Sequence, residues 1–262
     1  MSKQYALVTG ASSGIGVEFA RQLAQQGFSL ILVARRKERL EELKTEIEGK
    51  NKVEVIVIPL DLSKKDSATE LHQATTTRNI APQILINNAA YGIQGKFLDM
   101  DLGRVDNMFA LNMYTLTAMT QLYAKDMLAA GSGRIMNVAS AAAFLPSPYV
   151  ASYAATKSYV GSFTEALRYE MKGSGVSVTA FYPGITTTEF NAVADAKTPK
   201  AMDMSILSAE AVAKIGLKAM FKGKRAKVPG FINQVNAFLS TRMPRGFITS
   251  MAGSMLKKAN GW

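Results

Sequence analysis

A tyrosine and a lysine stand four residues apart in the second half of the chain, at Tyr153 and Lys157. On a helix this spacing places both side chains on one face, one turn apart. A nearby ammonium group stabilises phenolate over phenol and so lowers the pKa of the tyrosine. At ~4 Å and an effective dielectric constant of about 20, the Coulomb energy is about 4 kcal/mol, or about three pKa units. The pair therefore predicts a tyrosine that acts as a general acid and base near neutral pH.

A glycine-rich segment near the N-terminus is the second chemical signal. A short apolar run leads into it, and a helical pattern follows at once. Glycine allows a sharp turn and a close approach of the backbone to a ligand, and a helix N-terminus offers free N–H groups and a positive dipole end. A pyrophosphate fits such a turn, so the segment predicts dinucleotide binding. The expected cofactor contacts in Thr9-Gly10-Ala11-Ser12-Ser13-Gly14-Ile15-Gly16 are Gly10, Ser12, Ser13, Gly14, Ile15 and Gly16.

The same segment also contains Gly-x-Ser-x-Gly, the pattern of a hydrolase nucleophile elbow, which requires an acid and then a histidine later in the chain. The single histidine, His72, comes early and in a polar helical stretch, where we expect a solvated surface residue. A serine hydrolase is therefore disfavoured. The chain has no cysteine, which excludes disulfides, thiolate metal sites and cysteine nucleophiles, and we expect no metal site.

The end of the second apolar run bears on the choice between NAD and NADP. Folds that bind NAD usually place a carboxylate about 20 residues after the glycines, where it holds the ribose hydroxyls. Here the sequence reads Leu32-Val33-Ala34-Arg35-Arg36, with two guanidinium groups and no carboxylate. Guanidinium groups bind phosphate through charge-assisted, bidentate hydrogen bonds. Arg35 and Arg36 therefore favour NADP(H), whose 2′-phosphate we expect them to hold.

Strands and helices must position these residues. Short apolar runs rich in Val, Ile and Leu alternate with helical patterns, and near-continuous apolar strands are typical of a parallel sheet covered on both faces. This alternation predicts a single α/β domain with a doubly wound, Rossmann-like parallel sheet of about seven strands. The expected strands are Tyr5–Thr9, Phe28–Ala34, Val53–Leu60, Ile84–Asn87, Arg134–Ala139, Val176–Tyr182 and a seventh near Ala226–Val228. The expected helices include Ile15–Gln26, Lys37–Glu48, Asp101–Leu128, Ser152–Lys172 and Ala209–Phe221.

Together these motifs resemble those of the short-chain dehydrogenase/reductase superfamily. Each motif alone is weak, but their order and joint occurrence over residues 4–190 are highly specific. The resemblance implies an NADP(H)-dependent oxidoreductase that reduces a ketone or aldehyde, or oxidises the matching alcohol. It rests on the glycine segment, Asn87-Asn88-Ala89-Ala90, Asn112, Asn137-Val138-Ala139-Ser140, Tyr153-xxx-Lys157 and Pro183-Gly184.

The resemblance also implies a role for each residue. Tyr153 is expected to protonate the carbonyl oxygen, Lys157 to lower the pKa of Tyr153 and hold the nicotinamide ribose, and Ser140 to polarise the carbonyl. Asn112 is expected to hold a water that links Lys157 to solvent. Ala90 stands where the family usually has glycine, so we expect a small backbone strain there. The other implied cofactor contacts are Asp61 and Leu62 at the adenine, Asn88, Ala89 and Ala90, and Pro183, Gly184 and Thr188 at the carboxamide.

The substrate is expected to meet three segments with few charges: Ile93–Leu98, Ala141–Tyr149 and Thr186–Leu207. They predict a hydrophobic carbonyl substrate, either lipid-like or steroid-like. Two alternatives stay open: a 3-oxoacyl-carrier-protein reductase, and a catalytically silent dinucleotide sensor or scaffold. The apolar side chains expected at the substrate are Phe144, Leu145, Pro146, Tyr149, Phe190, Met202 and Met204.

Most of the net charge lies at the C-terminal end. The 262 residues carry 31 basic and 20 acidic side chains, a net charge of +11. Ten of the basic residues and none of the acidic ones follow position 210, so the preceding part carries a net charge of only +1. We therefore expect a dinucleotide-binding and catalytic domain, residues 1–230, and a basic amphipathic C-terminal extension of the same domain, residues 231–262.

This extension interleaves hydrophobic and basic residues over Phe231–Ser240 and Phe247–Lys258. Basic amphipathic helices lie on anionic membranes, pack on a partner subunit or receive an acidic acyl carrier, and they also pack on their own subunit. No nucleic-acid motif accompanies the charge, so no nucleic-acid partner is expected. The first ten residues lack the pattern of a secretory signal, and no apolar run reaches the roughly 18–20 residues of a spanning helix. We expect a cytoplasmic protein, and the family resemblance implies a homodimer or homotetramer.

Overall fold

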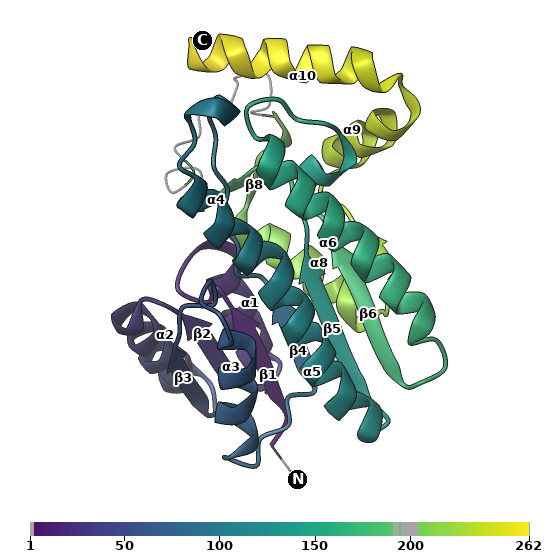
Figure 1. The fold of residues 1–262 in the computed structure, drawn as a ribbon. Coiled ribbons are helices and arrows are strands. Elements are labelled where there is room, and N and C mark those ends of the chain that lie inside the picture. The colour runs from purple at the N-terminus through teal and green to yellow at the C-terminus, as the bar shows by residue number, and fades with distance from the viewer. Residues whose placement is uncertain (1–2, 191–193, 195–203, 262) are drawn as a thin grey trace.

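A seven-stranded parallel sheet forms the centre of the computed structural model, which describes residues 3–190, 194 and 204–261 (Figure 1). The strands lie in the order β3-β2-β1-β4-β5-β6-β9, and every neighbouring pair is parallel. An order that starts at β1 and extends in both directions is the doubly wound arrangement, so the predicted fold is confirmed. The strands are β1 (Tyr5–Thr9), β2 (Ser29–Ala34), β3 (Val55–Pro59), β4 (Ile84–Asn87), β5 (Gly133–Val138), β6 (Val176–Phe181) and β9 (Ala226–Lys227).

Helices cover both faces of this sheet, because each strand sends alternate side chains to opposite sides. Ala6 and Val8 of β1 enter one apolar core and Leu7 enters the other. The first core is closed by α1 (Gly14–Gln25), α2 (Lys37–Lys50) and α8 (Ala209–Phe221). The second is closed mainly by α3 (Ser67–Thr76) and α5 (Leu116–Ala129), with α6 (Ala151–Glu170) packed beside them.

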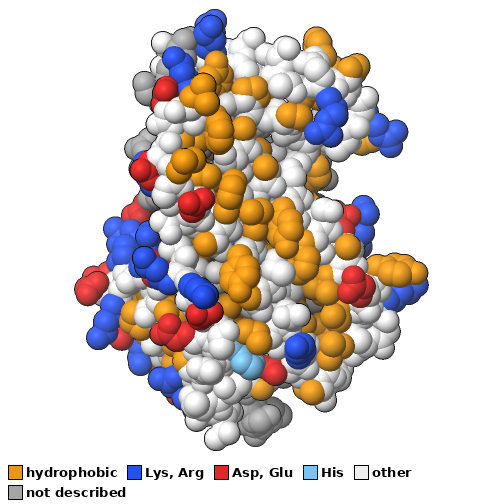
Figure 2. Space-filling model, in the orientation of Figure 1, with side chains coloured by type: hydrophobic (Ala, Val, Ile, Leu, Met, Phe, Trp, Pro, Cys, Tyr) orange, Lys and Arg blue, Asp and Glu red, His pale blue; other side chains and the backbone are white. Residues whose placement is uncertain are grey.

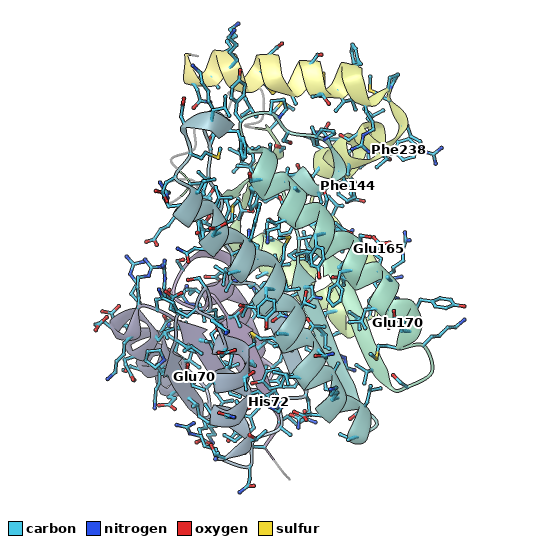
Figure 3. The ribbon with its side chains drawn as sticks, in the orientation of Figure 1. Glu70, His72, Phe144, Glu165, Glu170 and Phe238 are labelled. Carbon is cyan, nitrogen blue, oxygen red and sulfur yellow. The ribbon has the colours of Figure 1, made fainter. Side chains whose placement is uncertain are left out.

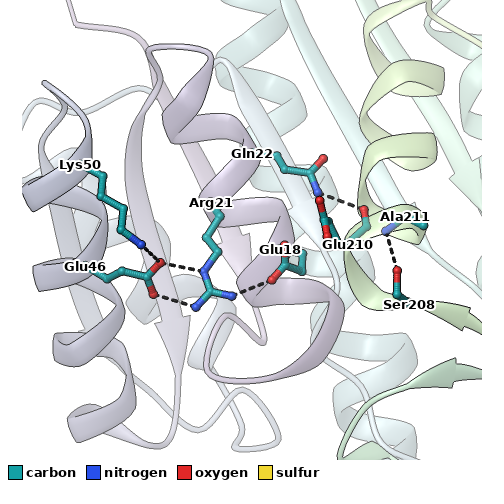
Figure 4. Close-up of polar contacts among 8 residues, drawn as sticks. All are labelled: Glu18, Arg21, Gln22, Glu46, Lys50, Ser208, Glu210 and Ala211. Carbon is teal, nitrogen blue, oxygen red and sulfur yellow. Dashed lines mark hydrogen bonds and ion pairs between the residues drawn. The ribbon is translucent and has the colours of Figure 1, made fainter.

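Polar contacts on the outer side of the first layer join α1 to its two neighbours (Figure 4). The Arg21 guanidinium donates two hydrogen bonds to the Glu46 carboxylate of α2, at 3.1 and 2.7 Å. On the other side, Gln22 Nε2 donates to the Glu210 carbonyl of α8 at 3.0 Å. These contacts hold the helix that begins at the glycine segment.

The helix expected over Asp101–Leu128 is interrupted. The structure has α4 (Leu102–Phe109), then a π-helical segment over Ala110–Thr115, and then α5. A π-helical turn holds an extra residue and is frequent at functional sites. The prediction of a single helix is therefore wrong in its middle. The sequence did not reveal the interruption, because one extra residue in a turn hardly alters the apolar periodicity.

His72 is not the solvated surface residue that we expected. Its side chain, on α3, is only 20% exposed, and its Nε2 lies 2.7 Å from Asp126 Oδ2 of α5 (Figure 3). Its ring also meets the ring of Tyr123 edge-on, with centroids 5.2 Å apart. The histidine thus joins α3 to α5 and lies away from the carboxyl ends of the strands.

The long connection after β6 contains a short element that sequence patterns did not predict. Thr186–Thr187 (β7) and Leu207–Ser208 (β8) pair as a two-stranded parallel sheet. Of the expected substrate-wall residues, Met202 lies outside the described residues. Short 3-10 turns also occur at Phe97–Asp99 and Ala141–Phe144.

Two helices complete the chain, α9 (Phe231–Arg242) and α10 (Arg245–Asn260). Figure 1 shows α10 lying across one end of the molecule, beyond the carboxyl ends of the strands. Asn233 is the buried residue of α9, and its Nδ2 donates to the carbonyls of Ser205 and Pro229, each at 3.1 Å. Within the described part of the chain, no helix is both long and apolar enough to cross a membrane.

Candidate active site

The glycine segment forms a turn that side chains would fill. Gly10 and Gly14 have φ of +67° and +57°, a region that glycine adopts readily and other residues avoid. A Cβ on Gly16 would lie 2.2 Å from the Gly10 carbonyl oxygen, so no other residue fits there without a shift of the backbone. This bare backbone, at the start of α1, fits a dinucleotide pyrophosphate.

The end of β4 is tied to this turn. Thr9 Oγ1 accepts hydrogen bonds from the backbone N–H groups of Asn88 and Ala89, both at 2.9 Å. The Asn88 side chain donates in turn to the Thr9 carbonyl at 2.9 Å. The predicted contacts Asn88 and Ala89 thus hold the shape of the glycine turn from the neighbouring strand end.

Ala90 bears no left-handed backbone strain, contrary to our expectation. Among the described residues, the only non-glycine residues with positive φ are Asp66, Asn79 and Tyr149. At position 90, alanine therefore adopts the backbone conformation of this chain without the left-handed φ that would require glycine. Tyr149, with φ of +66°, carries that strain instead, and it lies in the segment expected to meet the substrate.

The two arginines after β2, Arg35 and Arg36, interact with different residues. Arg36 donates from Nε to Ser12 Oγ and from Nη2 to the Ser12 carbonyl, both at 3.2 Å, so it reaches the glycine turn. Arg35 instead acts on Asp61. Burial alone would raise the pKa of Asp61, but hydrogen bonds from Ser63 and the charge of Arg35 bring it below its usual value. Arg36 thus lies beside Ser12 of the glycine turn, while Arg35 and Asp61 lie together at the neighbouring strand ends.

Leu62, the other residue expected at the adenine, has a structural role. Its side chain is buried, and its carbonyl accepts hydrogen bonds from Ser67 Oγ at 3.2 Å and from Thr115 Oγ1 at 2.8 Å. The segment after β3 is thereby fixed to α3 and to the π-helical segment.

Three residues expected to do the chemistry meet at the carboxyl end of β5. Ser140 follows β5 and hydrogen-bonds the phenol of Tyr153, which lies on the first turns of α6. Lys157, one turn further along α6, places its Nζ 5.9 Å from the centre of the Tyr153 ring. That Nζ donates to the Val138 carbonyl at 2.8 Å, which fixes the lysine to the same strand end. The predicted i, i+4 geometry is therefore present.

The surroundings of this pair change the expected titration. Burial raises the pKa of Tyr153 to about 12, and the hydrogen bond with Ser140 opposes this only in part. Burial also lowers the pKa of Lys157 from its ordinary 10.5 to about 7. The lowered pKa that we expected for Tyr153 is thus not found, because both groups are desolvated and the ammonium is itself destabilised. At neutral pH Tyr153 is a phenol with a proton to donate.

Burial of Lys157 also ties stability to pH. Between pH 7 and 10.5 the unfolded chain binds a proton at this lysine that the folded chain does not bind. The free energy of unfolding therefore rises with pH across this window, and the full cost of burying Lys157 is present below about pH 7.

Asn112 lies in the π-helical segment and is fully buried. Its Nδ2 donates to the Tyr91 carbonyl at 3.0 Å and to Thr156 Oγ1 at 3.1 Å, and its Oδ1 accepts from the Tyr91 N–H at 3.3 Å. Thr156 Oγ1 in turn donates to the Tyr153 carbonyl at 2.7 Å. Asn112 thus connects the loop after β4 to the helix turn that carries Tyr153.

The residues after β6 close the opposite side of the site. The Pro183 carbonyl accepts from the Ala141 N–H at 2.8 Å, and a Cβ on Gly184 would meet Asn233 Nδ2 at 2.6 Å. Thr188 lies over the glycine turn, since a Cβ on Gly14 would meet its Cγ2 at 2.8 Å. The segment that follows β6 therefore contacts both the glycine turn and α9.

Phe190 continues this segment onto Tyr153, with ring centroids 5.5 Å apart. Phe144, also expected at the substrate, packs instead on Tyr182 at 4.7 Å (Figure 3). A cleft of about 400 Å³ lies beside Ile93 and Gln94, within the expected wall segment, and charged side chains also line it. The apolar surroundings of Tyr153 thus come from Phe190 more than from Phe144.

A protein-family model described as short chain dehydrogenase matches residues 4–199. The chain belongs to this family. It is accordingly a dehydrogenase/reductase that acts between CH–OH and C=O, as the motifs predicted.

Curated relatives within this family include very-long-chain 3-oxoacyl-CoA reductases. That of Homo sapiens is 27% identical over 261 residues, which cover 97% of this chain and 83% of the relative. Very-long-chain 3-oxoacyl-CoA reductase-B of Danio rerio is 33% identical over 195 residues, which cover 72% of this chain and 62% of the relative. The chain thus spans less than two thirds of the Danio rerio protein.

Solved structures of the family are also similar. A short-chain dehydrogenase from Sphingobium yanoikuyae in complex with NADPH has a TM-score of 0.82 and 28% identity, over 94% of this chain and 95% of that chain. A bulky-bulky ketone specific alcohol dehydrogenase from Comamonas testosteroni has a TM-score of 0.77 and 26% identity, over 94% and 96% of the two chains.

Sequence reasoning missed two residues of the site, Arg39 and Glu189. Arg39 lies one turn after Arg36 at the start of α2, and this i, i+3 spacing was a signal in the sequence. Glu189 left no such signal, because its contacts join segments 150 residues apart along the chain.

Proposed function

We propose that the protein is an NADPH-dependent reductase of hydrophobic ketones or aldehydes. The observation that carries this proposal is the partly buried phenol of Tyr153, protonated at neutral pH, hydrogen-bonded to Ser140 and one helical turn from Lys157. A protonated phenol is suited to donate a proton, which is the task of an acid in carbonyl reduction. The NADPH in the Sphingobium yanoikuyae relative supports the choice of cofactor.

The chain's own residues fit this cofactor and this chemistry. The glycine turn and the start of α1 would hold the pyrophosphate, and Arg36 with Ser12 would hold the 2′-phosphate. When bound, NADPH supplies a hydride to the carbonyl carbon. Ser140 would donate a hydrogen bond to the carbonyl oxygen, and Tyr153 would give its proton to that oxygen as negative charge develops there. Lys157 would stabilise the phenolate that remains and hold the nicotinamide ribose.

For the substrate we propose a bulky hydrophobic carbonyl compound, of which a long-chain 3-oxoacyl thioester is the first candidate. The ring of Phe190 covers Tyr153, and an apolar side chain in that position favours an apolar substrate. The names of the Homo sapiens and Comamonas testosteroni relatives, a very-long-chain 3-oxoacyl-CoA reductase and a bulky-ketone alcohol dehydrogenase, support the same class. A 3-oxoacyl group on a carrier protein is the second candidate, because the basic C-terminal end would attract an acidic carrier.

Oxidation of NADPH with a panel of carbonyl compounds tests the proposal. We expect kcat/KM to rise with chain length among 3-oxoacyl-CoA esters and to be low for small polar ketones. Turnover confined to small polar carbonyls would refute the hydrophobic substrate. NADPH binding without turnover of any compound would instead indicate a sensor or scaffold.

We further propose that α9 and α10 form a surface for an anionic membrane. Large apolar side chains are exposed on both helices, with Phe231 80%, Phe238 58% and Phe247 56% exposed. Basic and hydrophobic side chains gather at this end of the molecule (Figure 2), and the sequence has no acidic residue after position 210. A second copy of this basic surface would repel the first. On an anionic membrane, the headgroups attract the cations and the acyl region accepts the aromatic rings. The resemblance supports a cytoplasmic homodimer or homotetramer, which would then assemble through other surfaces.

Vesicle flotation tests this surface. We expect the protein to float with anionic vesicles and much less with neutral ones, because the cations need a negative surface. Replacing Phe231 and Phe238 together with serine should remove most of this binding. Tyr169→Ser, which removes an equally exposed aromatic ring from α6, is the matched control and should float like the wild type. Equal flotation of the double variant would refute the proposal.

A further inference from the structure

One carboxylate occupies the two guanidinium groups beside the glycine turn. Glu189 Oε2 accepts from Arg36 Nη1 at 2.9 Å, and its Oε1 accepts from Arg39 Nη1 at 2.6 Å. The two arginines hold the pKa of this carboxyl below its usual range, so Glu189 is an anion at neutral pH. The same Arg36 donates its Nε and Nη2 to Ser12. Arg36 thus has every nitrogen of its guanidinium engaged, one of them by Glu189.

A phosphate placed beside Ser12 would require the donors that Glu189 already uses. Guanidinium groups bind carboxylate and phosphate through the same planar arrangement of N–H donors. A carboxylate that stayed in place would also repel a phosphate dianion. The Glu189 carboxylate therefore stands where one of the negative groups of the cofactor would be neutralised.

We infer that Glu189 is an internal counter-ion that competes with the 2′-phosphate of NADP(H) for Arg36 and Arg39, and so sets how strongly the site prefers NADP(H) to NAD(H). This inference rests on the proposed use of NADPH. Binding of the phosphate displaces the carboxylate from the arginines, and departure of the cofactor returns it to them. A cofactor without the 2′-phosphate leaves both ion pairs in place.

The position of Glu189 in the chain extends this exchange to the catalytic side. Thr188, before it, lies against the glycine turn, and Phe190, after it, packs on the ring of Tyr153. The residue released by the phosphate thus belongs to the segment that covers both the cofactor turn and the general acid. Phosphate recognition and the covering of Tyr153 are therefore carried by three consecutive residues.

The expected effect is modest, because these ion pairs are open to solvent. The side chains of Arg36, Arg39 and Glu189 are 41%, 46% and 44% exposed, and ion pairs at such positions are screened by water and salt. A change of charge at Glu189 should accordingly alter phosphate affinity several-fold and not by orders of magnitude.

Binding of two adenosine phosphates to the full chain tests the inference. Adenosine 2′,5′-bisphosphate carries the 2′-phosphate and adenosine 5′-monophosphate lacks it, so their dissociation constants isolate this contact. We expect Glu189→Gln to tighten the bisphosphate about fivefold at low salt and to leave the monophosphate within about twofold. The gain should shrink as salt is added.

Glu38→Gln is the matched control. Glu38 lies beside Arg39 in the first turn of α2, and within the described residues it has no ion-pair partner, so its removal should change either affinity by less than about twofold. Bisphosphate binding that is unchanged or weaker in Glu189→Gln would overturn the inference. A wild-type protein that does not prefer the bisphosphate would instead contradict the proposed use of NADPH, so the two failures are distinguishable.

Discussion

Replacement of Tyr153 with phenylalanine is expected to lower kcat about a thousandfold or more, while NADPH binding stays within about twofold of the wild type. The substitution removes only the hydroxyl, and the ring continues to pack on Phe190. The phenol is the acid that Ser140 hydrogen-bonds at this strand end, and its desolvation keeps the proton in place with a pKa of about 12. Loss of that proton donor should therefore affect the chemical step and not the binding of the cofactor. Single-turnover oxidation of NADPH and a separate binding titration measure the two effects.

Tyr159→Phe is the matched control for this prediction. Tyr159 lies on the same helix, and its hydroxyl lies 2.9 Å from Thr117 Oγ1, away from Ser140. The control should keep wild-type kcat. A Tyr153→Phe enzyme that retains more than about a tenth of the wild-type rate would show that another group supplies the proton.

Replacement of Gly16 with alanine is expected to have the second largest effect. The added Cβ would lie 2.2 Å from the Gly10 carbonyl oxygen and 2.8 Å from Asn88 Nδ2, and neither the backbone nor a side chain held by Thr9 moves freely. Overpacking of this kind costs about 1–3 kcal/mol of stability and shifts the turn that would hold the pyrophosphate. We therefore expect a lower Tm and NADPH binding weakened at least about tenfold.

Gly49→Ala separates this clash from a general effect of glycine replacement. Gly49 lies in α2 with open space around its Cβ position, so alanine should stabilise the helix slightly and leave NADPH binding unchanged. Thermal unfolding and calorimetric titration of both variants measure the difference. Wild-type NADPH affinity in Gly16→Ala would place the pyrophosphate somewhere other than this turn.

The fold was predictable because its signals are local. Strands β1 and β4 have the predicted bounds, and the other central strands end within two residues of them, because runs of Val, Ile and Leu between polar turns are a direct mark of buried parallel strands. The α8 helix also has its predicted bounds. The family, and with it the dehydrogenase/reductase activity, followed from motif order and is confirmed.

The site was predictable in its membership but less so in its energetics. The spacing of Tyr153 and Lys157 showed that they share a helix face, but not that burial would dominate their titration. Asn112 was found by motif, whereas its π-helical setting was not. Glu189 could not be found at all, because it meets Arg36 and Arg39 only after the chain has folded. Local sequence motifs thus identified the candidate catalytic side chains. Their protonation states, and the carboxylate that occupies the arginines, depend on contacts that form only in the folded protein.

The contacts of Asn233 bear on how the basic end of the chain can be altered. This side chain bonds two loop carbonyls, those of Ser205 and Pro229, and fills the space that a Cβ on Gly184 would need. A chain shortened at residue 230 would lose that donor and uncover Gly184 in the segment after β6. The α9 helix therefore supports the segment after β6 as well as carrying part of the acid-free, basic end of the chain. The positive charge of α9 and α10 can therefore be reduced by single substitutions on their exposed faces, whereas deletion of α9 would also remove the contacts of Asn233.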